Sequence, residues 1–108
     1  MDLQAAETLI ASKYPLVLQR AGVGGSVKLM FWLNTEGVPE SLQMREGSGY
    51  RTLNYAAMLA ARELRFRPAT RDGVPVGTWV EIVVHFVPGS GAGFMELDPM
   101  NRGGVGGY

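Results

Sequence analysis

The sequence predicts one small domain of the α+β class, and three observations support this. Three segments alternate apolar and polar residues with the period of two that is typical of β-strands, and others repeat apolar residues at the spacing of a helix. The chain has 108 residues, of which 46% are hydrophobic and 19% are charged. A chain of this length supports a single core, and this composition is too apolar for a disordered protein.

Helices are predicted near the N-terminus and in the middle of the chain. Residues 1–13 form the first, an amphipathic helix whose apolar side chains recur at helical spacing from Leu3 to Lys13. Tyr14-Pro15 interrupts it, because the residue before a proline is pushed out of the helical region, and one or two further turns lead to Ala21. Between Tyr50 and Leu64, alanines beside a helical apolar repeat favour a helix that lies close against a sheet.

The predicted strands are residues 26–34, 40–46 and 78–87. A short turn with glycine and proline joins the first two, which therefore form a hairpin. In the first and third strands, alternation gives one apolar face for the helices and an opposite face that carries Trp32 and Trp79. Residues 66–77, rich in turn-forming residues, are expected to be a connection.

Composition excludes several classes of function. Ten basic and ten acidic residues give a net charge of zero, so the positive surface of a general nucleic-acid binder is missing. With no cysteine and one histidine, His85, we expect no metal, no cofactor and no enzymatic activity. Glu81 is the nearest acid to His85 on its strand face, and a sheet-face histidine is the simpler interpretation. No stretch approaches the ~20 apolar residues that span a bilayer, so we expect membrane contact only indirectly, through partners.

The middle of the chain carries a series of short motifs in a fixed order. They are Tyr14-Pro15, Gly25 with Val27, Glu36-Gly37, Ser48-Gly49, Leu53-Asn54 with Ala56-Ala57, Phe66-Arg67-Pro68-Ala69, Asp72-Gly73, Pro75-Val76, Trp79 and Phe86. The most specific fragment is Phe-Arg-Pro-Ala followed by Asp-Gly-x-Pro-Val. In this order and spacing the motifs resemble the C-terminal domain of the TonB energy-transducer family. The resemblance covers roughly Tyr14 to Phe86, and the domain it implies is residues 14–88.

This resemblance implies a three-stranded antiparallel sheet with helices packed on one face and the last strand at a free edge. In the family the domain lies in the periplasm, is tethered to an inner-membrane helix by a Pro-rich spacer, and binds a short peptide of outer-membrane receptors. The peptide adds a strand beside the last strand. The implied function is therefore a non-catalytic protein–protein interaction by strand addition, with energy transduction to the receptors if the domain is fused to an anchor.

The candidate partner site combines the edge at residues 76–87 with the outward face of the sheet. Its side chains are Trp79, Glu81, Val83, His85, Val87, Trp32 and Met30. Two tryptophans on an open face require a cover, which the N-terminal helix, the C-terminal tail or a partner could supply. The edge could also be protected by the tail or by pairing in a homodimer.

The C-terminal segment, residues 89–108, is Gly-rich and is expected to be a flexible tail. It suggests an alternative function, an unanchored structural or accessory subunit of a larger complex, membrane-bound or not. Such a subunit would use the same fold and dock through the apolar tail residues Phe94, Met95, Leu97 and Met100. We expect a periplasmic location for an excised transducer domain. If the chain natively starts at Met1, we expect a cytoplasmic protein that reaches a membrane through its partners.

Overall fold

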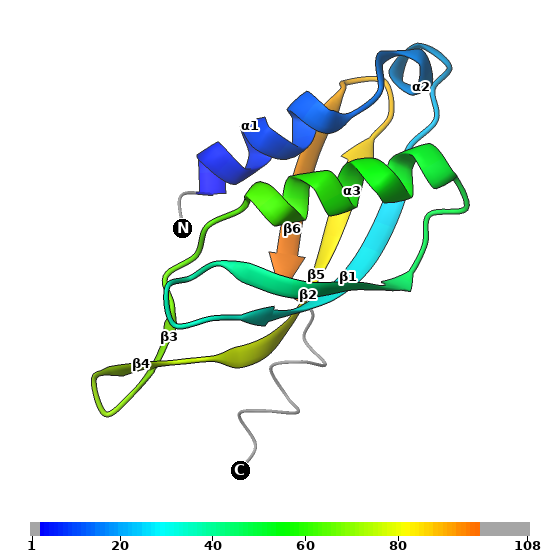
Figure 1. The fold of residues 1–108 in the computed structure, drawn as a ribbon. Coiled ribbons are helices and arrows are strands. Elements are labelled where there is room, and N and C mark those ends of the chain that lie inside the picture. Colours follow the sequence, from blue (N-terminus) through cyan, green and yellow to red (C-terminus); the bar gives the residue numbers. More distant parts are fainter. Residues whose placement is uncertain (1–2, 98–108) are drawn as a thin grey trace.

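A computed structural model describes residues 3–97 of the chain (Figure 1). The helices are α1 (Leu3–Lys13), α2 (Leu16–Arg20) and α3 (Arg51–Glu63). The strands are β1 (Gly25–Leu33), β2 (Pro39–Glu46), β3 (Ala69–Arg71), β4 (Val74–Val76), β5 (Thr78–Val87) and β6 (Ala92–Leu97). The helix expected from Leu3 to Lys13 is confirmed with these bounds, and the helix expected between Tyr50 and Leu64 is α3.

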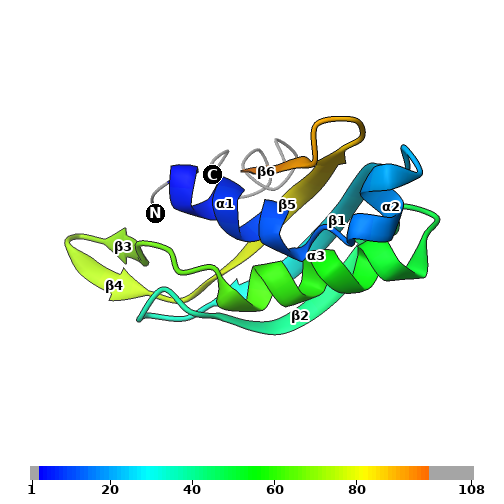
Figure 2. The same ribbon diagram turned by 90° about the horizontal axis from the view of Figure 1, so that it is seen from above.

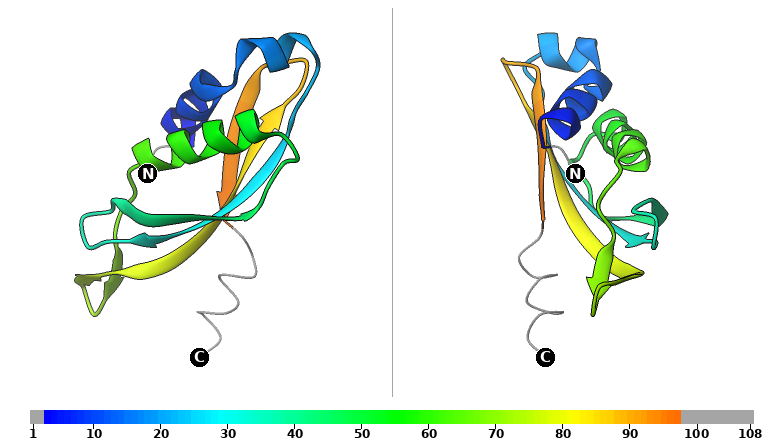
Figure 3. Two further views of the ribbon diagram at one scale, coloured as in Figure 1. Left: turned by 45° about the vertical axis from the view of Figure 1, so that its right-hand side comes forward. Right: turned by 90° about the vertical axis from the view of Figure 1, so that its left-hand side faces the viewer.

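The main sheet is antiparallel and has the strand order β2-β1-β5-β6, and β3 and β4 form a separate hairpin. The helices α1 and α3 lie on the same side of this sheet, and no helix of residues 3–97 lies on its other side (Figures 2 and 3). The expected α+β class is therefore confirmed, with helices on one face. The sheet has four strands where three were expected, because residues 92–97 of the expected tail form β6.

The core lies between the helices and the inner face of the sheet. Strand alternation places Phe31 of β1 and Ile82 of β5 in it, both with no exposed surface. From α3 the core receives Leu53 and four small alanines, which let the helix approach the strands closely. Tyr14, at the break between α1 and α2, packs its ring on Phe86 at 5.0 Å.

The fourth strand forms because a glycine lets a helix lie against it. A Cβ on Gly93 would stand 2.5 Å from Cγ2 of Ile10 and 3.1 Å from the backbone nitrogen of Ala11, both in α1. Only a residue without a side chain fits there, so the glycine that suggested flexibility is instead required for close packing. Met95, on the same face of β6, is half-buried against the core.

The connection predicted for residues 66–77 also contains regular structure. The strands β3 and β4 form a hairpin in which Arg71 is opposite Val74. Asp72 and Gly73 have φ values of 52° and 81°, the left-handed pair that a two-residue hairpin turn requires. The hairpin projects from the base of the molecule, beyond the end of the sheet (Figure 1).

Candidate interaction surface

Outward side chains of the sheet form rows across the strands, because residues directly opposite each other in an antiparallel pair point to the same side. Three of these rows are Glu40–Trp32–Trp79, Gln43–Met30–Glu81 and Glu46–Lys28–Val83–Glu96. The next row begins at Ser26 and continues through His85 to Phe94. Val87, two positions after His85 and opposite Ala92, continues the same side of β5, so all seven side chains of the predicted partner site lie on one face, as the alternation of β1 and β5 indicated.

The two tryptophans form a pair on this face. Their ring centroids are 5.4 Å apart and the rings are nearly perpendicular, at 75°. Gly77 lies so close to the Trp32 ring that a Cβ there would overlap it, and Trp32 is half-buried as a result. Trp79 keeps 42% of its surface exposed. Of the covers considered, neither the N-terminal helix nor the described part of the tail lies over the tryptophans, because α1 packs on the other side of the sheet and β6 lies within the plane of the sheet.

The expected free edge of β5 is only partly free. Ile82 is opposite Leu97 and Val87 is opposite Ala92, so residues 82–87 have β1 on one side and β6 on the other. The expectation of an open edge is corrected for this half of the strand. Within the described range 3–97, Thr78–Glu81 have a strand partner on the β1 side alone.

The other two strand edges differ in protection. The β2 edge carries charged side chains and two register irregularities, and Ser41 has the left-handed φ of 54°. Charges and bulges of this kind discourage the pairing of a further strand. The outer edge of β6 has no strand partner among residues 3–97.

His85 lies at the centre of a polar series that ties three strands together. Its Nδ1 is 2.7 Å from Oγ of Ser26 on β1, and its Nε2 is 2.8 Å from Oε1 of Glu96 on β6. Phe94 stacks on the imidazole at 4.5 Å. The acidic partner of His85 is therefore Glu96, although Glu81 was the nearest acid in sequence. Sequence reasoning missed Glu96 because it missed β6.

A serine, a histidine and a carboxylate in series are also the groups of a hydrolase triad. Catalysis by such a triad requires backbone or side-chain donors aimed at a developing oxyanion in a site from which water is excluded. Here the series crosses an open sheet, Ser26 is exposed, and neighbouring backbone groups belong to the strand ladders. We interpret the series as a link that holds β6 to β5 and β1.

The predicted tail-docking residues belong to β6 as far as the structure describes them. Phe94 rests on His85, Met95 is half-buried against the core, and Leu97 is 46% exposed. They do not form a free tail, because they are part of the strand that pairs with β5. Met100 lies outside the described residues.

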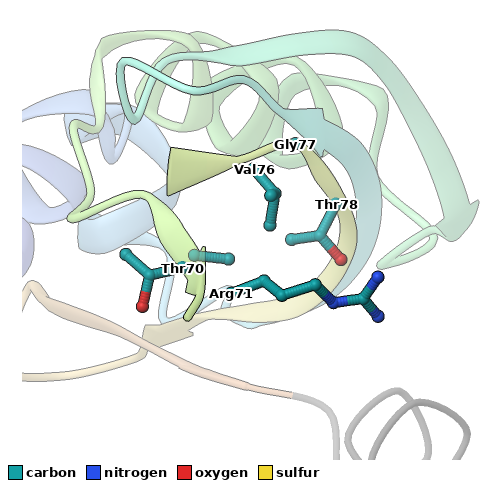
Figure 4. A pocket seen from close by; sticks show the side chains of 6 residues that line it. Thr70, Arg71, Val76, Gly77 and Thr78 are labelled. Atoms are coloured by element: carbon teal, nitrogen blue, oxygen red, sulfur yellow. The ribbon is translucent and has the colours of Figure 1, made fainter. Parts of the chain in front are cut away.

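A cavity of about 340 Å³ lies beside the first residue of β5 (Figure 4). It is lined by Ala69, Thr70, Arg71, Val76, Gly77 and Thr78. Sequence reasoning missed it because it treated this region as an irregular connection. The Asp-Gly pair in the middle of the region was the signal for the hairpin that forms one wall.

Two further functional features, a metal site and a membrane-spanning helix, are absent from residues 3–97. In this part of the chain no group of three or more histidine or acidic side chains is arranged to hold a metal ion. None of its helices is long and apolar enough to cross a bilayer.

Comparison with known proteins gives consistent matches over most of the chain. The family model described as "Gram-negative bacterial TonB protein C-terminal" matches residues 10–88. The Protein TonB of Vibrio cholerae is 30% identical over 77 residues, which are 71% of this chain and 32% of that protein. The Protein tonB2 of Pseudomonas aeruginosa is 32% identical over 76 residues, which are 70% of this chain and 28% of that protein. The chain thus spans about a third of the length of these relatives.

A solved structure of the TonB2 protein from Vibrio anguillarum resembles the fold. The two structures superpose with a TM-score of 0.53 over 71% of this chain and 74% of that chain, at 26% sequence identity.

Proposed function

Because the chain belongs to the family of C-terminal domains of the Gram-negative bacterial TonB protein, we propose that it is a non-catalytic protein-interaction module. It binds an extended segment of a partner protein as an added strand. The proposed binding place is the open edge of β5 at Thr78–Glu81. The observation that carries this proposal is that, within residues 3–97, Thr78–Glu81 pair with β1 on one side and with no strand on the other.

Strand addition at this edge follows from elementary sheet geometry. An unpaired strand offers a row of backbone donors and acceptors, and a partner segment gains main-chain hydrogen bonds from them. Four residues of a strand cover about 13 Å, so a segment of about four residues would pair directly, in line with β6. Alternate side chains of that segment would lie beside Trp79 and Glu81 on the outer face.

The partner class is proposed from the family. We propose a short segment of an outer-membrane receptor, bound in the periplasm, as the strand that is added. Energy transduction would follow if this domain is linked to an inner-membrane anchor, because a bound receptor segment can be moved only by a domain that is itself held. A subunit of a membrane complex that offers an extended segment would use the same edge.

A photocrosslinking experiment in cells tests the edge. Benzoylphenylalanine replaces Trp79, an exposed aromatic residue next to the proposed binding edge, and in matched control variants it replaces Met44 on β2 or Tyr55 on α3. We expect crosslinks from position 79 to one extended receptor segment, identified by mass spectrometry of the crosslinked peptide, and few from the controls. The same segment crosslinked chiefly from position 44 or 55 would contradict the proposal.

A further inference from the structure

The outer face of the sheet carries an aromatic surface that nothing in residues 3–97 covers. Trp79 is 42% exposed, and its ring stands nearly perpendicular to that of Trp32 at 5.4 Å. Met30 lies in the adjacent row, so three large apolar side chains adjoin on two strands. Exposed apolar surface that is rimmed by polar groups commonly marks an interaction site.

Two carboxylates flank this aromatic surface, one on each side. Glu40 of β2 is opposite Trp32 in the first row, and Glu81 of β5 is opposite Met30 in the second. The amide Nδ2 of Asn34 donates to Oε2 of Glu40 at 2.9 Å, which holds that carboxylate in place. Within residues 3–97, neither carboxylate forms an ion pair.

Among residues 3–97, register places more negative than positive groups on this face. They are the carboxylates of Glu40, Glu46, Glu81 and Glu96 and one ammonium group, that of Lys28, while the pairing assigns Arg45, at a register irregularity of β2, to neither face. The Lys28 ammonium is 3.5 Å from Glu46, in the row beyond Met30. The charge left beside the tryptophans is therefore negative.

We propose that this face binds a basic segment of a partner protein, with lysine or arginine side chains lying over the exposed tryptophan and facing Glu40 and Glu81. A cation over an indole face is attracted by the ring quadrupole, and the flanking carboxylates add charge complementarity. The occupant is a protein segment, because the same carboxylates repel the phosphates of anionic lipids and nucleic acids.

The geometry sets the spacing of the basic side chains. The rows run from β2 through β1 to β5, so Glu40 and Trp79 are two strand spacings apart, which is about 10 Å. In a peptide with polyproline II conformation, which has three residues per turn, side chains three positions apart lie on the same side and are separated by about 9 Å. The surface therefore fits two basic residues with two residues between them.

This surface shares Trp79 and Glu81 with the β5 edge, but its second carboxylate, Glu40, belongs to it alone. Glu40 is on β2, two strands away from that edge, and it takes no part in pairing there. The variant Glu40→Gln should weaken binding of the basic segment and leave crosslinking from position 79 at the β5 edge unchanged. Failure of either proposal is thus distinguishable from failure of the other.

The test is a titration of the full isotope-labelled chain, followed by NMR at low ionic strength. The probe is an end-blocked synthetic peptide with two lysines separated by two serines, and the control probe is the same peptide with both lysines acetylated. We expect saturable shifts of the Trp32 and Trp79 indole N–H signals with the lysine peptide. The acetylated peptide should bind about tenfold more weakly, because acetylation removes the charge.

A pair of variants separates local contact from net charge. The double variant Glu40→Gln with Glu81→Gln should weaken binding about tenfold, and Glu36→Gln, in the exposed turn between β1 and β2, should change it less than about twofold. Binding that is unchanged in the double variant, equal for both peptides, mapped to the α1 and α3 side, or absent at low salt would overturn the proposal. Spectral dispersion of each variant verifies that it is folded.

Discussion

Replacing Gly93 by alanine should destabilise the domain by forcing α1 away from β6. The added Cβ would stand 2.5 Å from Cγ2 of Ile10 and 3.1 Å from the nitrogen of Ala11. Rotation of a side chain cannot relieve the second contact, because it involves the backbone of the helix. Ile10 is completely buried, so a shift of α1 also exposes apolar surface.

The magnitude follows from two opposing effects. Overpacking of a well-filled core costs about 1–3 kcal/mol, and Gly→Ala recovers about 0.4–1 kcal/mol by restricting the unfolded chain. With mid-range values of about 2 and about 0.7 kcal/mol for the two effects, the net loss in the free energy of unfolding is about 1.3 kcal/mol. For a domain of this size each kcal/mol lowers Tm by about 4–8 °C.

Urea unfolding, followed by far-ultraviolet circular dichroism and tryptophan fluorescence, measures the change. The matched background is Ile10→Ala, which removes the Cγ2 atom in question and keeps the Cβ of residue 10, at 3.2 Å from the position of the added methyl group. There Gly93→Ala should cost at least about 0.5 kcal/mol less than in the original chain. Unchanged or increased stability of Gly93→Ala, or the same cost in both backgrounds, would refute the close approach of α1 and β6.

Three further changes test other parts of the structure. His85→Ala removes the link from Ser26 to Glu96 and should lower the free energy of unfolding by about 1–2 kcal/mol. Hydrogen exchange should become faster in β6 than in β2, and a uniform acceleration in both strands would contradict the link. Tyr14→Phe leaves the carbonyl of Val23 without its 2.6 Å hydrogen bond and should cost about 1–3 kcal/mol in thermal unfolding, so an unchanged Tm would contradict its importance. Trp79→Asp should lower the free energy of unfolding by only about 1 kcal/mol, because the residue is half-exposed. Its affinity for the crosslinked receptor segment, measured by calorimetry, should fall at least tenfold, and retained affinity would argue against this face.

Strand alternation allowed much of the sheet to be predicted. In β1 and β5 the period of two is unbroken, and it placed Trp32 and Trp79 on the face opposite the helices, where the structure has them. Such a pattern is reliable because a shift by one residue would exchange the buried and exposed faces.

The fourth strand could not be predicted with the same rule, because its decisive residue has an ambiguous meaning. Gly93 favours flexibility in an isolated segment, and it favours close packing only when a helix is already opposite it. That helix is α1, about eighty positions earlier in the chain. The partners of His85 and the covered half of the β5 edge were missed for the same reason, since both depend on β6.

The order of strands also has a consequence for how quickly the domain can fold. The central pair, β1 and β5, brings together Leu29 and Ile82, which are about fifty positions apart in sequence. Closing so long a loop costs entropy before any contact compensates for it, whereas β2 and β6 join their neighbours through short turns. Pairing of β1 with β5 should therefore limit the rate of folding. The strand β6, added last through a local turn, should be able to open without unfolding of the other strands.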